Sequence, residues 1–206
     1  MGQSQLAEQQ YTEEEYLALD NASDRKHEFW YGRIVAMAGA KDNHNNLSGE
    51  IVTAINRRLD DSPCQATPGD QRVRLEDGNG YAYPDVLVRC PDARWAEKNH
   101  LTLLNPRVLV EILSPSTAAR DWNVKLPAYK RIPELQDYLI ISQSRVAIEH
   151  FRRNATGVWE SFSYNRRHQT VHLAFNDLQI PVGELYRKLD VPEQLVLWDD
   201  ADEDAS

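Results

Sequence analysis

An α/β fold, with a central mixed β-sheet flanked by helices, is predicted by two patterns in this 206-residue sequence. Three short apolar runs, separated by turn-rich loops, have the length and composition of buried strands. They are "DVLVRC" (85–90), "RVLVEIL" (107–113) and "DYLIIS" (137–142). A longer segment at 42–61 repeats apolar residues every four positions, as a helix packed on a sheet does. No internal repeat interrupts this succession, so we expect one layered domain.

The N-terminal region predicts a short helix and a hairpin. Thr12 and Glu15 have the spacing of a capping box, ahead of an apolar group at the start of a helix. The segment "HEFWYGRIVAMAG" (27–39) places apolar and aromatic residues on both sides of a turn near Gly32. This pattern is typical of a β-hairpin.

The helix predicted for 42–61 carries a histidine at its start. Its apolar positions recur every four residues: Leu47, Ile51, Ile55 and Leu59. His44 falls three residues before the first of them, so it lies on the inward face near the N-terminal end of the helix. Asp42 or Asn43 can cap that end.

The C-terminal half alternates strands with short helices. A strand is predicted at 72–75, and a helix around 122–132. The segments 146–154 and 159–165 alternate in polarity around the turn "NATG", which indicates a second hairpin. A final short helix is expected within 178–189.

Composition bounds the class of protein. No apolar run approaches the roughly 20 residues that cross a bilayer, and the polar, acidic N-terminus is not a secretory signal. We therefore expect a cytoplasmic protein with no membrane partner. The two cysteines, Cys64 and Cys90, lie far apart in the sequence without metal-ligand spacing, and we expect reduced thiols. The expected organisation is a loose leader (1–11), one domain (12–192) and an acidic tail (193–206).

The net charge of −9 argues against tight, non-specific binding to nucleic acid. Five of the acidic residues stand among the last eight, and without them the charge is −4. Any nucleic-acid contact must therefore come from local basic patches. The best candidates are Arg152 and Arg153 in one segment and Arg166 and Arg167 in another, although a solvated hairpin face explains them equally well.

Two of the apolar strands carry one carboxylate each, which is costly unless the charge is paired or binds something. Asp85 follows Pro84 at the mouth of the first strand, and Glu111 lies in the middle of the second. Alternation puts Glu111 on the same face as Leu109 and Leu113. If the strands pair so that the two carboxylates meet, they can hold Mg²⁺, which prefers oxygen ligands.

The whole pattern resembles a known family. A proline–aspartate pair before an apolar strand, with a glutamate about 26 positions later, resembles the PD-(D/E)XK nuclease superfamily. The longer pattern is similar to the Uma family of endonucleases within it. The matching elements are "HEFWYGRIVAMAGA", "NHNNLSGEI", "YAYPDVLV", "LVEILSPSTAARDWNVKLPAYKRIPELQDYLII" and "LQIPVGELY". The resemblance runs from about Glu28 to Leu185 and implies a restriction-endonuclease-like fold with additional β-hairpins.

One position departs from the superfamily. A lysine is expected two residues after the glutamate, where this chain has Leu113. The resemblance implies that Lys125 on the following helix replaces it. Asp121, Lys125 and Tyr129 share a helical spacing of four, but Pro127 is unfavourable inside a helix. The conflict eases if Asn123 caps the helix, and Asp121 then precedes it.

The resemblance implies metal-assisted hydrolysis of phosphodiester bonds, with DNA favoured over RNA as the substrate. Asp85, Glu111 and the backbone carbonyl of Ile112 would hold Mg²⁺ or Mn²⁺, and Lys125 would serve catalysis. Four residues are expected in an outer role: Glu28, His44, Asp121 and Tyr129. A homodimer would suit cleavage of both strands of a duplex.

Structural roles compete with each of these assignments. Asp85 can be a turn residue, and Glu111 can pair with Arg107 or Arg120. Lys125 can be a solvated helix residue. His44 can be a satisfied inward histidine, Glu28 can pair with Arg25 or Lys26, and Asp121 can cap the helix. For the whole chain, the main alternative is a non-catalytic binding or assembly module with the nuclease fold, and a hydrolase of smaller phosphate esters is a third.

Overall fold

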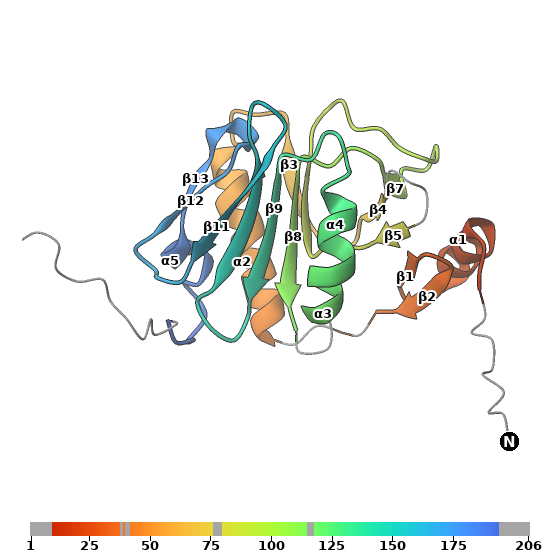
Figure 1. Cartoon of the computed structure of the whole chain (residues 1–206), viewed down its shortest axis with the longest axis horizontal. Coiled ribbons are helices and arrows are strands. Elements are labelled where there is room, and N and C mark those ends of the chain that lie inside the picture. Colours follow the sequence, from red (N-terminus) through yellow and green to blue (C-terminus); the bar gives the residue numbers. More distant parts are fainter. Residues whose placement is uncertain (1–9, 38, 40–41, 76–79, 115–117, 194–206) are drawn as a thin grey trace, which may run out of the picture.

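The architecture is a six-stranded mixed sheet covered on both faces (Figure 1). The computed structural model describes residues 10–37, 39, 42–75, 80–114 and 118–193. The central sheet has the strand order β11-β10-β9-β8-β6-β3. Its strands are β3 (Gln65–Pro68), β6 (Val86–Arg89), β8 (Val108–Leu113), β9 (Asp137–Ser142), β10 (Ile148–Arg153) and β11 (Trp159–Tyr164). The predicted α/β class, with helices flanking a mixed sheet and additional hairpins, is confirmed.

One face of the sheet packs against a long helix. This helix, α2 (Asp42–Arg58), inserts Leu47, Ile51 and Ile55 of the predicted apolar row, and Leu59, the fourth, is buried directly after its end. Beside it lie the strands β12 (Thr170–His172) and β13 (Gln179–Pro181), the 3-10 helix η2 (Phe175–Asp177) and the short helix α5 (Val182–Leu185). Together these elements bury the larger apolar core of the protein.

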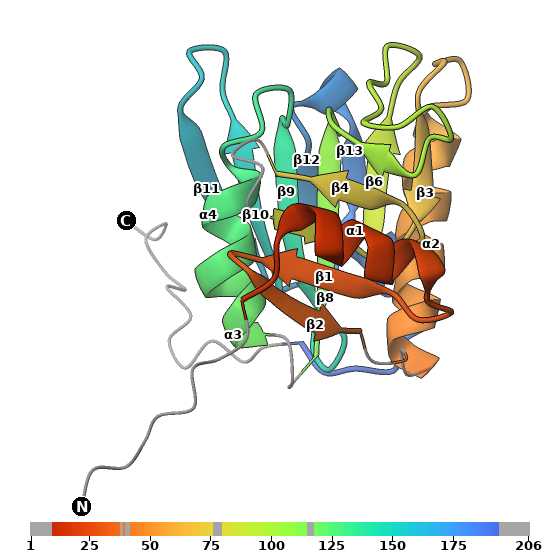
Figure 2. The same ribbon diagram turned by 90° about the vertical axis from the view of Figure 1, so that its right-hand side faces the viewer.

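The other face is covered by a second, smaller sheet and by an irregular helix. The second sheet has the order β2-β1-β5-β4-β7. Its strands are β1 (His27–Trp30), β2 (Arg33–Ala36), β4 (Arg72–Arg74), β5 (Gly80–Ala82) and β7 (Thr102–Leu103). Helix α1 (Glu13–Ala22) packs on it and begins with the predicted capping box. Figure 2 shows α1, β1 and β2 in front of the central sheet, between the irregular helix on one side and α2 on the other.

The predicted N-terminal hairpin is formed by β1 and β2. Tyr31 and Gly32 make its turn, and both have a positive φ, of 49° and 87°. Two consecutive positive φ values are what a tight two-residue hairpin turn needs. This turn fixes the register of β1, which places Glu28 and Trp30 on the same face of the strand.

The irregular helix connects β8 to β9, which run parallel. It consists of α3 (Ala118–Arg120), the π-helical turn η1 (Asp121–Lys125) and α4 (Leu126–Tyr129). Neither Asn123 nor Asp121 caps this helix, as the two alternatives from the sequence had it, because the helical segment already begins at Ala118. The wide turn, in which the Leu126 N–H donates to the carbonyl of Asp121, carries the helix past Pro127. Asp121 is therefore inside the helix and buried.

The prediction of reduced thiols is also wrong. Strands β3 and β6 pair antiparallel, with Gln65 opposite Arg89, so the residues that flank this pair face each other. These are Cys64 and Cys90, which form a disulfide across the edge of the central sheet. Sequence distance misled the prediction because the register of the two strands brings the cysteines together.

In the described part of the chain, no helix has the length and apolar character needed to cross a membrane. The predicted acidic tail after Glu193 and most of the N-terminal leader lie outside the described residues.

Candidate active site

The two carboxylates singled out in the sequence lie next to each other on the central sheet. Strands β6 and β8 are antiparallel, and Val86 pairs with Val110. The next position of this register puts Asp85 opposite Glu111. A side-chain oxygen of Asp85 accepts the backbone N–H of Ile112 at 2.6 Å. Since the N–H and carbonyl of a strand residue point to the same edge, the Ile112 carbonyl is directed toward β6 as well.

Lys125 reaches the same place from the irregular helix. Its ammonium lies 2.9 Å from Glu28, 3.0 Å from Glu111 and 3.4 Å from Asp121. The π-helical turn directs Asp121 and Lys125 inward together, and both are buried. Lys125 is therefore not a solvated helix residue, and the helical spacing that the sequence suggested does bring these groups together.

Leu113 occupies the strand position where the superfamily pattern has a lysine. Its side chain packs against the apolar core between the sheet and the irregular helix. Its carbonyl accepts a hydrogen bond from Gln143 at 2.8 Å. The strand thus supplies no cation to the carboxylates, and the cations near them, Lys125 and Arg120, come from the irregular helix.

Glu28 comes from the smaller sheet. Besides Lys125, it accepts a hydrogen bond from the indole N–H of Trp30 at 3.2 Å, and Arg120 lies 3.7 Å away. Glu28 does not pair with Lys26, which instead contacts Asp70. Trp30 was not predicted as a site residue. The alternation of side chains along a strand puts it on the same face as Glu28, and this pattern could have identified it.

His44 and Asp85 form the more accessible side of the site. His44 Nε2 lies 3.1 Å from Asp85, and each side chain is 17% exposed. The hydroxyl of Ser48, one turn further along α2, donates to the backbone carbonyl of Asp85 at 3.4 Å. The first turns of α2 therefore hold Asp85 from the side opposite to the lysine.

Tyr129, at the end of α4, contacts Glu111. Its buried hydroxyl donates to a Glu111 oxygen at 2.8 Å. Burial raises the pKa of Tyr129, and the neighbouring carboxylates of Glu111 and Glu28 raise it further. The hydroxyl therefore keeps its proton and acts as a hydrogen-bond donor to Glu111.

Charge in this cluster is unbalanced. We define the acid cluster as Glu28, Asp85, Glu111, Asp121 and Lys125. Lys125 contacts three of its four carboxylates, whereas Asp85 contacts His44, and Arg120 approaches Glu28 from outside the cluster. Burial raises the pKa of Glu111; Lys125 opposes this, while the neighbouring carboxylates add to it. For Lys125, burial lowers the pKa, but the surrounding carboxylates outweigh burial and raise it. The cluster thus retains an excess of negative charge.

The donor set fits a hard divalent cation. Asp85, Glu111 and the Ile112 carbonyl offer oxygen ligands, and Mg²⁺ commonly uses one or two carboxylates while keeping several waters. A divalent cation would also offset the negative excess. Within the described residues, no group of three or more acidic, histidine or cysteine side chains is already arranged to hold a metal ion. The fit thus rests on the donor chemistry and the charge.

The four arginines predicted as nucleic-acid contacts have partners within the chain. Arg152 lies 3.0 Å from Glu160, and Arg166 lies 3.8 Å from Glu193. Arg153 donates to the carbonyl of Lys130 at 2.7 Å. Arg167 donates to three backbone carbonyls: Tyr186, Leu189 and Val191.

Taken together, a central mixed sheet with acidic residues on adjacent strands and a flanking helix between β8 and β9 defines a restriction-endonuclease-like fold. A solved structure of this kind is similar to the chain with a TM-score of 0.68 and 20% identity. It is described as a putative nuclease belonging to DUF820 from Anabaena variabilis ATCC 29413, and the match covers 85% of this chain and 97% of that one.

Sequence comparison identifies the family. The profile of the Uma2 family, described as "Putative restriction endonuclease", matches residues 13–183. The chain is 34% identical to the uncharacterized protein slr1290 of Synechocystis sp. (strain PCC 6803) over 85% of this chain and 91% of that protein. It is 32% identical to sll1609 of the same organism over 72% and 84%. The chain belongs to the Uma2 family.

Proposed function

We propose that this protein is a metal-dependent endonuclease that hydrolyses phosphodiester bonds of nucleic acid, DNA in preference to RNA. The observation that carries the proposal is the acid cluster, in which three buried carboxylates share one buried lysine and a fourth, Asp85, lies beside Glu111. Such a cluster costs stability, and a buried carboxyl whose pKa is raised by burial and by neighbouring carboxylates, as that of Glu111 is, is typical of functional sites. The Uma2 family and the nuclease-like fold support this reading.

Each residue has a distinct role in the proposal. Asp85, Glu111 and the Ile112 carbonyl would hold Mg²⁺ or Mn²⁺. The bound metal would acidify a water molecule and polarise the phosphate. Lys125, beside Glu111, would orient the attacking water or offset charge on a phosphate oxygen.

The outer residues keep this arrangement in place. Glu28 and Asp121 would hold the ammonium of Lys125, and Tyr129 would fix the orientation of Glu111. His44, on the accessible side of Asp85, would contact a phosphate of the bound strand. A two-fold dimer would allow both strands of a duplex to be cut.

The proposal is tested by incubating plasmid and single-stranded DNA with Mg²⁺, Mn²⁺ or EDTA. The variants are Asp85→Asn, Glu111→Gln and Lys125→Met, which preserve side-chain size. Wild type should cleave only with metal, and each variant should lose about 10²-fold or more of the rate. Lys130→Met is the matched control, since Lys130 follows the same helix but contacts the rings of Phe151 and Trp159 and not the acids. Full activity in Lys125→Met alone would exclude the helix lysine from catalysis.

A non-catalytic binding module is the second candidate, because Leu113 replaces the expected strand lysine. That candidate predicts nucleic-acid binding without cleavage in any metal. Calorimetric titration with Mn²⁺ distinguishes the two candidate functions. If wild type binds no divalent cation and cleaves no nucleic acid, the protein is a binding module.

A further inference from the structure

A group of basic side chains bridges the end of α2 and the segment after α5. We call it the α2–α5 basic patch and define it by four cations and two acids: Arg57, Arg58, Arg187, Lys188, Glu50 and Glu184. Arg58 and Arg57 lie 2.8 and 3.2 Å from Glu184. Arg187 and Lys188 lie 2.6 and 2.9 Å from Glu50. Four cations thus share two carboxylates in a chain whose overall charge is −9.

The patch is layered, with acids inside and cations outside. The side chains of Glu50 and Glu184 are 3% and 17% exposed, whereas those of Arg57 and Lys188 are 59% and 64% exposed. Contacts with the cations lower the pKa of both acids, so these remain ionised and hold the cations in place. The solvent therefore meets the positive side of each ion pair.

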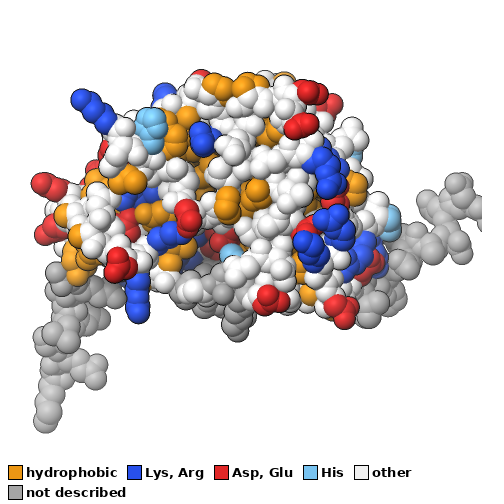
Figure 3. Space-filling model, turned by 180° about the vertical axis from the view of Figure 1, so that it is seen from behind, with side chains coloured by type: hydrophobic (Ala, Val, Ile, Leu, Met, Phe, Trp, Pro, Cys, Tyr) orange, Lys and Arg blue, Asp and Glu red, His pale blue; other side chains and the backbone are white. Residues whose placement is uncertain are grey.

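This arrangement differs from that of two of the four arginines expected from the sequence to contact nucleic acid; the other two, Arg152 and Arg166, pair with Glu160 and Glu193. Arg167 donates to three backbone carbonyls and Arg153 to two, so their positive charge is engaged inside the fold. Viewed from behind (Figure 3), Lys and Arg side chains gather in one area of the molecule with Asp and Glu side chains among them. A surface that presents cations over buried acids suits a polyanion.

Helix α2 connects the patch to the candidate site. His44, in its first turn, contacts Asp85, and Arg57 lies in its last turn. Arg57 stands 13 positions after His44 (57 − 44 = 13), which spans about 20 Å along the helix at 1.5 Å per residue. With a rise of about 3.4 Å per nucleotide, this distance corresponds to roughly six nucleotides.

We propose that the α2–α5 basic patch binds the phosphate backbone of the nucleic acid that the acid cluster cleaves, about six nucleotides from the scissile bond. The inference rests on the proposed function. It predicts that efficient cleavage requires a substrate extending at least that far to one side, because shorter substrates cannot reach the patch.

The test removes one cation from each acid, so that neither carboxylate is left unpaired. Arg57→Gln/Lys188→Gln keeps Arg58 on Glu184 and Arg187 on Glu50. The matched control is Arg94→Gln/Lys98→Gln, which removes the same charge from exposed positions elsewhere. Binding of a labelled 30-base-pair duplex is measured by fluorescence anisotropy between 50 and 300 mM salt, with EDTA present to prevent cleavage, and melting temperatures confirm folding.

The patch variant should bind more weakly, and the slope of log K against log salt should decrease by about 2, roughly 0.9 for each lost phosphate contact. The control should match wild type. If the patch variant matches wild type in affinity and slope, the patch is not the interface. If wild type binds but never cleaves while the patch variant binds more weakly, the interface stands and the nuclease proposal fails. Absence of binding by wild type would overturn the interface.

Discussion

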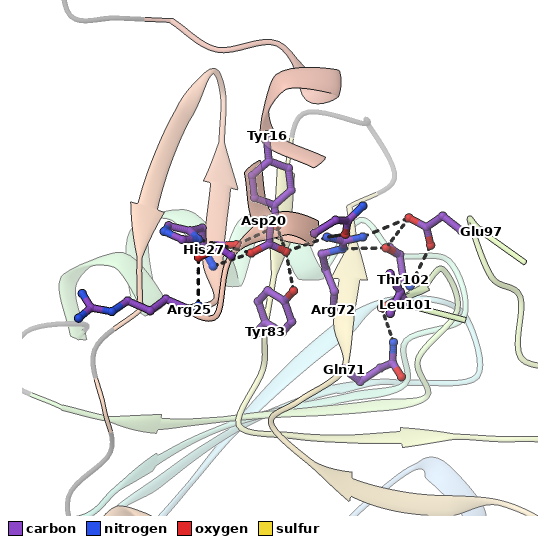
Figure 4. A network of polar contacts seen from close by, with 12 residues as sticks. Tyr16, Asp20, Arg25, His27, Gln71, Arg72, Tyr83, Glu97, Leu101 and Thr102 are labelled. Carbon is purple, nitrogen blue, oxygen red and sulfur yellow. Dashed lines mark hydrogen bonds and ion pairs between the residues drawn. The ribbon is translucent and has the colours of Figure 1, made fainter. Parts of the chain in front are cut away.

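Two buried polar clusters in this protein are built around a single cation, and they are balanced differently. The first lies between α1 and the smaller sheet (Figure 4) and is centred on the pair Asp20–Arg72, which we call the Asp20–Arg72 hub. The Arg72 guanidinium donates to Asp20 at 2.7 Å, to Thr102 at 2.8 Å and to the partly exposed Glu97 at 3.2 Å. The second is the acid cluster of the candidate site around Lys125.

In the hub, both carboxylate oxygens of Asp20 accept hydrogen bonds. Asp20 also accepts the backbone N–H of His27 at 2.8 Å and the hydroxyl of Tyr83 at 2.6 Å. Burial raises the pKa of Tyr83, and its hydrogen bond to Asp20 raises it further, so the hydroxyl stays a donor. One buried carboxylate meets one buried guanidinium, and the contacts are those of a structural network.

The acid cluster is different because its carboxylates outnumber its cation. The raised pKa of Glu111 reports the energetic cost of burying this charge. The charged groups of the hub pair with each other and form hydrogen bonds. The acid cluster keeps an excess of negative charge, so binding of a further cation would stabilise it. The comparison suggests that the hub contributes stability, and that the acid cluster gives up stability for function.

Removing the cation from each cluster should have the largest effect. Arg72→Met and Lys125→Met each leave buried carboxylates without their partner, and each should lower the free energy of unfolding by about 3–5 kcal/mol. Mg²⁺ should restore stability to Lys125→Met, since a divalent cation can offset the charge of the acid cluster, but not to Arg72→Met. Urea unfolding with Mg²⁺ and with EDTA measures both effects. An equal response of the two variants to Mg²⁺ would contradict the proposed difference.

A double-mutant cycle should sharpen the interpretation of the hub. Asp20→Asn alone leaves Arg72 without its closest carboxylate, while Asp20→Asn/Arg72→Met removes both buried charges. The double variant should lose less stability than the sum of the single variants, by about 0.5–3 kcal/mol. Additive losses in urea unfolding would show that the two side chains do not act as a pair.

Much of the central sheet was predictable, because alternation along a strand fixes which side chains share a face. The face assigned to Glu111 is the one observed, and the pairing of β6 with β8 brings Asp85 beside it. The strands β5 and β7 span three and two residues, so their pairing depends on tertiary contacts and not on local sequence. The disulfide escaped prediction for the same reason, since it depends on the register between β3 and β6.

The sequence predicted which residues form the candidate site, but it did not predict how the helix brings them together. The family resemblance named Lys125, but a regular helix could not reconcile Asp121, Lys125 and Pro127. The π-helical turn resolves that conflict, and such a turn has no simple sequence signal. The α2–α5 basic patch was missed because Arg57 and Lys188 lie far apart in the sequence and reach one surface only through packing of α5 on α2.

The smallest expected effect is a gain in stability at the acid cluster. Glu111→Gln removes one of four carboxylates but keeps an oxygen for the Tyr129 hydroxyl, and it should stabilise the fold by about 0.5–2 kcal/mol. It should also abolish cleavage. Asp20→Asn should instead lower the free energy of unfolding, because it leaves the buried Arg72 guanidinium without its closest carboxylate.

The gain from Glu111→Gln should depend on pH. A carboxyl with a raised pKa binds its proton more tightly in the folded than in the unfolded state, so wild-type stability falls as pH rises from the ordinary range of a glutamate toward the folded-state pKa. Glutamine does not titrate, and its advantage should therefore increase over that interval. Urea unfolding of both proteins in EDTA, from pH 4 upward, measures the difference. A variant that is less stable than wild type at every pH would mean that Glu111 is satisfied where it lies, and the contrast between the two clusters would then disappear.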